Sequence, residues 1–247
     1  MIRYVYAVKH LLAIKINLLV IVWSNALLFY NDFNPIPLSI AHSPYVALHF
    51  YSDAAGPKKS LTLQNDWVFD LTLDPGAASV GFSLDPPFSP YFCSIITWPP
   101  VLLSLSTAHS TLFEFFNLLL PFAGLKRRLT GFHIILHVDN TACIDIWKNK
   151  YCKHSELVSV FVQCLHVLEA ALECRIFLEH SPRRSSLETI LVDNLSRRST
   201  TSPDDLLLLT DALHYQPRGP LLDWLLSPTP DWSLPRHLAQ YVLSETI

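Results

Sequence analysis

The hydrophobic and polar positions of the 247-residue chain form short apolar runs and longer segments with helical spacing. The short runs predict strands at 45–51, 78–84, 91–97, 132–138 and 175–178. The longer segments predict helices at 107–123, 155–172 and 187–197, and a further helix that opens at Asp139-Asn140-Thr141, where short polar side chains cap a first turn. This order of elements predicts an α/β fold in which helices cover a mixed sheet. The first strand is apolar throughout, so we expect it in the centre of the sheet.

The first 44 residues form a helical flank in this interpretation. Residues 1 to about 31 have a helical pattern, and the prolines of 34–37 force an extended linker. The uncharged run 16–31 is shorter than the roughly 18 apolar residues of a spanning helix. A docked amphipathic or buried helix is therefore favoured, and we expect no stable membrane anchor. A signal peptide with its apolar region at 16–23 stays open as the alternative.

Two further segments lie outside the predicted sheet. Residues 54–76 are polar and turn-rich, and their pattern indicates no role. The tail from 199 to 247 is interrupted by prolines and contains the pairs Asp223-Trp224 and Asp231-Trp232, which we expect to pack back onto the domain. We therefore divide the chain into a flank at 1–44, a main domain at 45–198 and a tail at 199–247.

Composition excludes several classes of protein. A chain of this length with 50% hydrophobic and 16% charged residues is neither disordered nor a disulfide-stapled mini-protein. Only six glycines are present, and no GxGxxG, GKS or GKT phosphate loop occurs. The formal net charge of −3 means that any nucleic-acid binding must be local. The five cysteines form no CxxC pair and predict reduced thiols, so we expect an intracellular protein, cytoplasmic or nuclear.

Four carboxylates are candidates for chemistry. Asp53 and Asp139 follow apolar strands, where α/β sheets place ligand groups. Glu114 is the only charged residue of an otherwise apolar predicted helix, and Asp193 lies on the last helix. Each residue alone also fits an ordinary turn, cap or exposed position. Together they have the placement to converge on one sheet edge, where divalent cations with oxygen ligands would let them ionise and two ions would assist phosphodiester hydrolysis.

These acids stand within recognisable motifs: Tyr51-Ser52-Asp53-Ala54-Ala55-Gly56, a helical Glu114, His137-Val138-Asp139-Asn140-Thr141-Ala142 and Val192-Asp193-Asn194-Leu195-Ser196-Arg197. Over about residues 45–198 the motifs resemble the ribonuclease H domain of retroelement reverse transcriptases, with the closest likeness to DIRS-like elements. Integrase and transposase relatives of this fold have the acid order Asp-Asp-Glu, whereas the order here is Asp-Glu-Asp-Asp. The integrase-like alternative is therefore disfavoured.

The resemblance implies a ribonuclease H-like mixed five-stranded sheet flanked by helices. It also implies a metal-dependent endonuclease that cleaves the RNA strand of RNA/DNA hybrids. Catalytic and metal-binding roles for Asp53, Glu114, Asp139 and Asp193 follow from it, with two Mg²⁺ or Mn²⁺ as cofactors. His180 corresponds to the family's mobile histidine, and an ordinary strand-end histidine is the alternative.

The flanks also resemble retroelement polyproteins. Residues 23–35 resemble the segment that joins polymerase to ribonuclease H, and 221–234 resemble the tail that follows the nuclease. No Tyr-x-Asp-Asp polymerase motif is present. We therefore expect a detached C-terminal piece of a polyprotein, with a polymerase domain from a related element as a candidate partner.

Local basic groups supply candidate contacts to the hybrid. Lys148, Lys150 and Lys153 begin a helical turn or two after Asp139, and Asn140 directly follows this acid. Phosphate contacts of this kind position a duplex without reading its bases. An exposed, solvated face is the alternative for each lysine.

Two other functions stay open. The first is a catalytically decayed ribonuclease H-like module retained for nucleic-acid or protein binding. The long stretch 54–76, the missing polymerase and the position of His180, farther ahead of Asp193 than in the family pattern, motivate this alternative. The second is a membrane-anchored protein that uses residues 1 to 30.

Overall fold

The computed structural model describes residues 47–56, 58–61, 67–70, 75–82, 89–103, 110–197 and 200–244. These residues belong to one compact unit, Tyr45–Ile247. The flank expected at 1–44, its linker and the alternative signal peptide lie outside the described residues. Among the described helices, none combines the length and the apolar character needed to cross a membrane.

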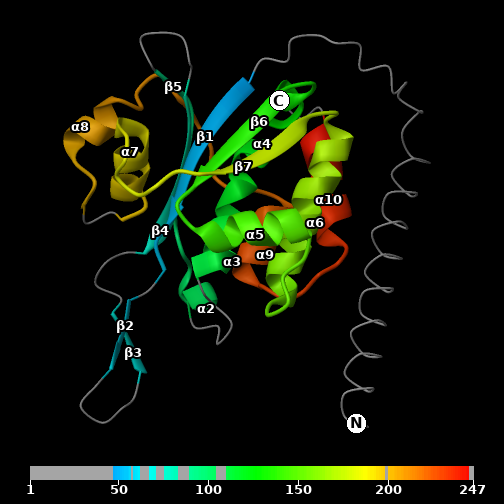
Figure 1. Ribbon diagram of the computed structural model, residues 1–247, viewed down its shortest axis with the longest axis horizontal. Coiled ribbons are helices and arrows are strands. Elements are labelled where there is room, and N and C mark those ends of the chain that lie inside the picture. Colours follow the sequence, from blue (N-terminus) through cyan, green and yellow to red (C-terminus); the bar gives the residue numbers. More distant parts are fainter. Residues whose placement is uncertain are drawn as a thin grey trace. The chain divides into compact units, whose positions relative to one another are not determined.

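A six-stranded mixed sheet lies at the centre of the described structure (Figure 1). Its strands, in spatial order, are β7 (Arg175–His180), β6 (His133–Val138), β1 (Ala47–Ala54), β4 (Gly76–Phe82), β5 (Pro90–Thr97) and β8 (Leu213–His214). The pairs β1–β4 and β4–β5 are antiparallel, whereas β1–β6, β6–β7 and β5–β8 are parallel. The predicted mixed sheet and the central position of its first strand are confirmed. The sheet has six strands where five were expected, because the tail adds β8. This strand has only two residues, too few to show an alternation of hydrophobic and polar positions.

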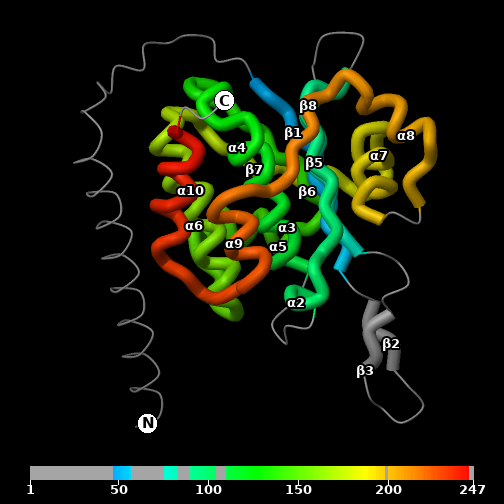
Figure 2. Tube along the Cα trace, turned by 180° about the vertical axis from the view of Figure 1, so that it is seen from behind, coloured from blue at the N-terminus to red at the C-terminus, as the bar shows by residue number. Residues whose placement is uncertain are grey.

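Helices cover both faces of this sheet (Figures 1 and 2). One face carries α7 (Leu187–Leu195) and α8 (Pro203–Leu207). The other face carries α3 (Ser110–Leu118), α4 (Leu120–Leu125), α5 (Thr141–Asn149), α6 (Glu156–Ala171), α9 (Pro220–Leu226) and α10 (Leu234–Leu243). A short helix α2 (Pro100–Leu103) and the 3-10 turn Lys126–Leu129 complete the described helical elements. The prediction of an α/β fold in which helices flank a mixed sheet is therefore confirmed.

Local sequence explains where several helices begin and end. The Asn140 side chain accepts a hydrogen bond from the Ala142 amide and caps α5, as predicted. Ser186 and Thr189 form a reciprocal capping box at the start of α7. The single helix predicted at 107–123 is instead divided into α3 and α4, because Pro121 lacks an N–H group and fits only the first turn of a helix.

The segment 54–76 contains a second, two-stranded antiparallel sheet. Its strands are β2 (Lys58–Leu61) and β3 (Trp67–Asp70). The sequence marks this segment only as polar and turn-rich, because four-residue strands leave too little alternation to distinguish them from turns.

The tail packs against the main domain, as expected. The Trp224 ring in α9 lies 5.5 Å from the Phe116 ring of α3 and 4.5 Å from the Phe161 ring of α6, measured between centroids. Trp232 Nε1 donates a hydrogen bond to Glu156 Oε1 over 2.8 Å. Trp224 therefore attaches the tail to α3 and α6, and Trp232 attaches it to α6.

Candidate metal centre

Two carboxylates reach the centre from neighbouring parallel strands. Asp53 is the penultimate residue of β1, and Asp139 directly follows β6. Tyr51 pairs with His137 in the register of these strands, so the two acids stand beside each other two residues further along. Asp53 therefore lies within β1, whereas the sequence predicted it just after the end of the strand.

Glu114 brings a third carboxylate from α3. Only 2% of this residue is exposed, so the alternative of an exposed polar stripe does not hold. Asn117, also buried on α3, donates hydrogen bonds to the backbone oxygens of Asp53 and Ala78 over 3.1 and 2.8 Å. These bonds fix the helix against β1 and β4 and hold Glu114 at the end of β1.

The three acids form the one group of at least three candidate ligand residues found in the described part of the chain. One oxygen from each of Asp53, Glu114 and Asp139 lies within 4.8 Å of the other two. Burial raises the pKa of Asp53 to about 6, while the hydroxyl of Ser196 opposes this shift and the charge of Asp139 adds to it. Burial also raises the pKa of Glu114 well above its ordinary value, and the charges of Asp53 and Asp139 add to that effect. The three groups therefore need a cation to ionise together.

The carboxylate of Glu114 offers an unused ligand atom. Its Oε2 is buried and has no hydrogen-bond partner, although the Ala54 backbone amide bonds to the carboxylate. Leaving a buried polar atom without a partner costs about 1–3 kcal/mol. Mg²⁺ and Mn²⁺ prefer oxygen ligands of this kind, and such an ion would provide both the partner and the missing positive charge. The residues present therefore fit a hard divalent cation.

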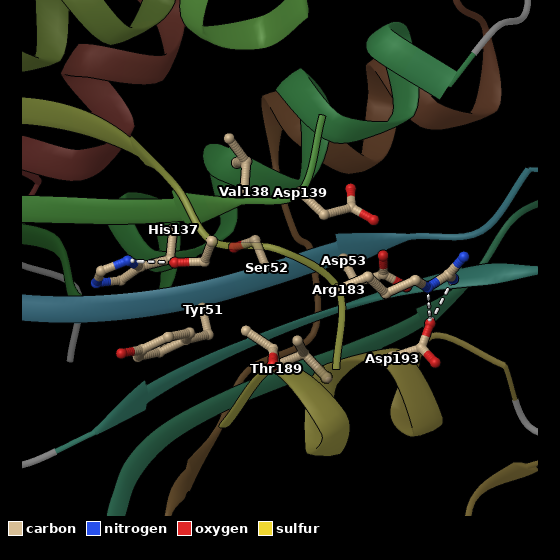
Figure 3. A pocket seen from close by; sticks show the side chains of 11 residues that line it. Tyr51, Ser52, Asp53, His137, Val138, Asp139, Arg183, Thr189 and Asp193 are labelled. Carbon is tan, nitrogen blue, oxygen red and sulfur yellow. Dashed lines mark hydrogen bonds and ion pairs between the residues drawn. The ribbon is translucent and has the colours of Figure 1, made fainter. Parts of the chain in front are cut away.

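Asp193 borders the same pocket but is bound to arginines. Together with Asp53 and Asp139 it lines the pocket drawn in Figure 3. Its Oδ1 accepts a 2.6 Å hydrogen bond from Arg183 Nε, and it also pairs with Arg183 Nη2 and Arg197 Nη1. The structure thus brings three of the four predicted acids together and connects the fourth to guanidinium groups.

The other predicted site residues lie outside this group of acids. His180 is an exposed residue at the end of edge strand β7 and is not among the residues that line the pocket. The Asn140 side chain is engaged in the cap of α5. Lys148, Lys150 and Lys153 are exposed within α5 and just after it. Their roles stay predictions.

A histidine pair beside the acids was missed from the sequence. His137 Nε2 lies 2.9 Å from His49 Nδ1, and His137 Nδ1 lies 2.9 Å from Ser181 Oγ. The His137 ring stacks on Tyr51 with 4.1 Å between centroids. Burial, assisted by His49, lowers the pKa of His137 to about 4, so the ring is neutral at neutral pH. The signal was available, because residues two apart in a strand share a face and His137 therefore lies on the face of Asp139.

Arg183, Arg197 and Ser196 were also missed as members of the site. Ser196 donates a hydrogen bond to Asp53 Oδ2 and is buried. Arg197 follows Asp193 by four residues, a spacing that places side chains together on a helix, so this pair was open to prediction. The approach of Arg183 depends on the path of the loop between β7 and α7, which no local pattern reveals.

Comparison with known proteins gives similar solved structures only, since no protein-family model and no curated protein matches the chain. RNase H1 from the archaeon Halobacterium salinarum is 13% identical, with 63% of this chain and 97% of that one covered and a TM-score of 0.43. The N-terminal RNase H domain of a Mycobacterium tuberculosis protein is 15% identical, with 64% and 100% covered and a TM-score of 0.43.

A third structure is an RNase H1 isolated from compost by a metagenomic approach, in complex with an RNA/DNA hybrid. It is 13% identical, with 65% of this chain and 99% of that chain covered and a TM-score of 0.41. Two of these structures are RNase H1 proteins and one is an RNase H domain. The mixed sheet with helices on both faces agrees with the ribonuclease H-like fold that the motifs imply.

Proposed function

We propose that this protein is a metal-dependent endonuclease that cleaves the RNA strand of RNA/DNA hybrids. The observation that carries the proposal is the convergence of Asp53, Glu114 and Asp139, together with the buried Glu114 Oε2 that has no hydrogen-bond partner. The choice of the hybrid as substrate, and an origin in a retroelement, rest on the resemblance of the motifs around these acids.

The three carboxylates would hold the divalent cation. When bound, a divalent cation stabilises negative charge on phosphodiester oxygens and lowers the pKa of a water molecule. The protein's own contribution is to place the ligands: Asn117 holds α3 against the strands, and the Ser196 hydroxyl orients the Asp53 carboxylate. Because these supports are buried, the ligands keep their positions when the substrate arrives.

The substrate duplex would lie along α5. This helix begins two residues after Asp139. Its exposed Lys148, with Lys150 at its C-cap and Lys153 just beyond, offers positive charge for phosphates. Such contacts orient a duplex without sequence preference. Selection of RNA would depend on the 2′-hydroxyl groups and the A-like shape of the hybrid.

A decayed module that binds nucleic acid without cleaving it is the second candidate. It is favoured by the pairing of Asp193 with Arg183 and Arg197, because a carboxylate engaged by two guanidinium groups is not free to bind a metal ion. The two candidates differ in one outcome: the module would bind the hybrid and leave its RNA intact.

A panel of labelled substrates separates these candidates. We expect the purified chain with Mg²⁺ to cut the RNA strand of a hybrid, and to leave duplex DNA, duplex RNA and single-stranded RNA uncut. Addition of EDTA should stop the reaction, because the carboxylates alone supply no positive charge. Retention of the hybrid on a native gel with intact RNA in Mg²⁺ and in Mn²⁺ would overturn the nuclease and favour the module.

A further inference from the structure

Two arginines bridge Asp193 and Asp53. Arg183 lies between these acids in Figure 3, with its Nε 2.6 Å from Asp193 Oδ1 and its Nη2 3.9 Å from Asp53 Oδ2. Arg197 Nη1 pairs with the same Asp193 oxygen, and Arg197 Nη2 lies 3.8 Å from Asp53 Oδ2. The positive charge of both side chains is therefore shared between the fourth acid and one member of the carboxylate group.

The arrangement is built into the fold. Arg197 follows α7, donates to the backbone oxygen of Asp193 over 3.0 Å, and its backbone bridges to Pro75 beside β4. Asp193 itself is buried at 6% exposure, so its charge requires partners. Guanidinium groups suit this task, because they stay protonated and present several donors in one plane.

The charges of the site balance with a single ion. Four ionised carboxylates carry four negative charges, and two of these are cancelled by the guanidinium groups of Arg183 and Arg197, the arginines that pair with both Asp193 and Asp53. One divalent cation at Asp53, Glu114 and Asp139 cancels the other two. A second divalent cation at Asp193 would have to displace both arginines or lie against their charge, which is unfavourable at these distances.

We infer that the site takes one divalent cation, held by Asp53, Glu114 and Asp139, and that Arg183 and Arg197 take the place of the second cation expected from the sequence. The inference rests on the proposed function, since it concerns the same metal centre. Arg183 has 45% of its side chain exposed and is thus accessible to a substrate phosphate, whereas Arg197 is 25% exposed and holds Asp193 in position.

Manganese stoichiometry tests this inference without relying on activity. The full chain is titrated with Mn²⁺ in a calorimeter, and electron paramagnetic resonance spectra are recorded. Both measurements are made first on the protein alone and then on the protein with a hybrid whose RNA strand carries 2′-O-methyl groups that block cleavage. We expect one Mn²⁺ per chain and a spectrum of isolated ions in both cases. Two Mn²⁺ per chain with a spin-coupled spectrum would overturn the inference and leave the proposed function intact, whereas absence of Mn²⁺ binding would overturn both.

Variants of Asp193 and of the two arginines extend the test of the Mn²⁺ stoichiometry. Asp193→Asn is expected to keep one Mn²⁺ per chain, and loss of an ion would contradict the inference. The double variant Arg183→Gln with Arg197→Gln is expected to bind a second Mn²⁺ and to bind the first about ten-fold more tightly, since positive charge near Asp53 is removed. If Arg183 and Arg197 only stabilised the fold of the site, the double variant would bind Mn²⁺ more weakly instead. A double variant that stays at one Mn²⁺ contradicts the inference.

Arg184→Gln is the matched control for the double variant. It removes a positive charge from the same loop, but Arg184 is 60% exposed and reaches only Asp193 Oδ2, at 3.9 Å. We expect its stoichiometry and affinity to match the wild type. Circular dichroism checks that each variant folds, and should the double variant unfold, the wild-type and Asp193→Asn titrations decide the question.

Discussion

Glu114→Gln is expected to abolish cleavage and, at the same time, to stabilise the metal-free protein. An amide cannot supply the negative charge that the cation requires, and loss of a bound cation removes several kcal/mol of charge stabilisation. At about 1.4 kcal/mol for each factor of ten, cleavage should fall by about 10³-fold or more. A core residue without a role in metal binding would not combine this loss with greater stability.

The stability gain follows from the raised pKa of Glu114. Because the folded protein holds the Glu114 proton above the ordinary pKa of 4.5, it binds more protons than the unfolded chain there. The contribution of Glu114 to the stability of the metal-free wild type is therefore fully present below about pH 4.5 and is lost as the pH rises toward and through its raised pKa. Glutamine does not ionise, and its amide can donate to the neighbouring carboxylates, so Glu114→Gln should be more stable at pH 7 by about 1–3 kcal/mol.

Thermal unfolding between about pH 4 and 8, with and without Mg²⁺, measures this effect. We expect the pH dependence of the variant to be flatter than that of the wild type, and Mg²⁺ to stabilise only the wild type. Glu179→Gln is the control, because it makes the same change at an exposed position of β7. A Glu114→Gln protein with an unchanged or lower midpoint at pH 7 without metal would contradict the account of the buried carboxylate.

Trp224→Ala is expected to destabilise the protein by about 3–5 kcal/mol. Trp224 is only 5% exposed and packs between Phe116 and Phe161, and its Nε1 donates to the Thr229 backbone oxygen over 3.1 Å. Phe116 lies on α3 two residues from Glu114, so the tail supports the helix that carries this acid.

Urea denaturation of Trp224→Ala and Trp232→Ala compares two tryptophans of the same tail. Trp232 is partly exposed and its indole contact is a hydrogen bond to Glu156, so its replacement should cost about 1 kcal/mol. Equal losses in the two variants would show that the contacts of Trp224 with α3 and α6 do not stabilise the domain.

Most of the sheet and three of the acids were open to prediction for physical reasons. Buried central strands must be apolar, which marked β1 and β6, and acids at the ends of such strands stand out, as Asp53 and Asp139 do. Glu114 stood out because a charge within an apolar helix requires a partner. For these residues, the local sequence of a few neighbouring positions is enough to predict where they lie in the fold.

The remainder depended on contacts between distant segments. The engagement of Asp193 by Arg183 requires a loop to cross beside α7, and the bond from Ser196 to Asp53 joins residues far apart in sequence. Strand β8 consists of two residues that pair with β5, so only the folded sheet defines it. The division at Pro121 was visible in the sequence, because proline fits the first turn of a helix and not its interior.

The measurement that tests the nuclease proposal most directly is the rate of RNA-strand cleavage in a labelled RNA/DNA hybrid with Mg²⁺, for the wild type and Asp139→Asn side by side. Asp139 joins the ligand group from the end of β6 and is only partly buried, so its replacement removes a carboxylate at little cost in packing. We predict cleavage by the wild type that EDTA stops, and a rate at least about 10³-fold lower for the variant. Equal rates for the two proteins, or intact RNA with both, would contradict the proposal.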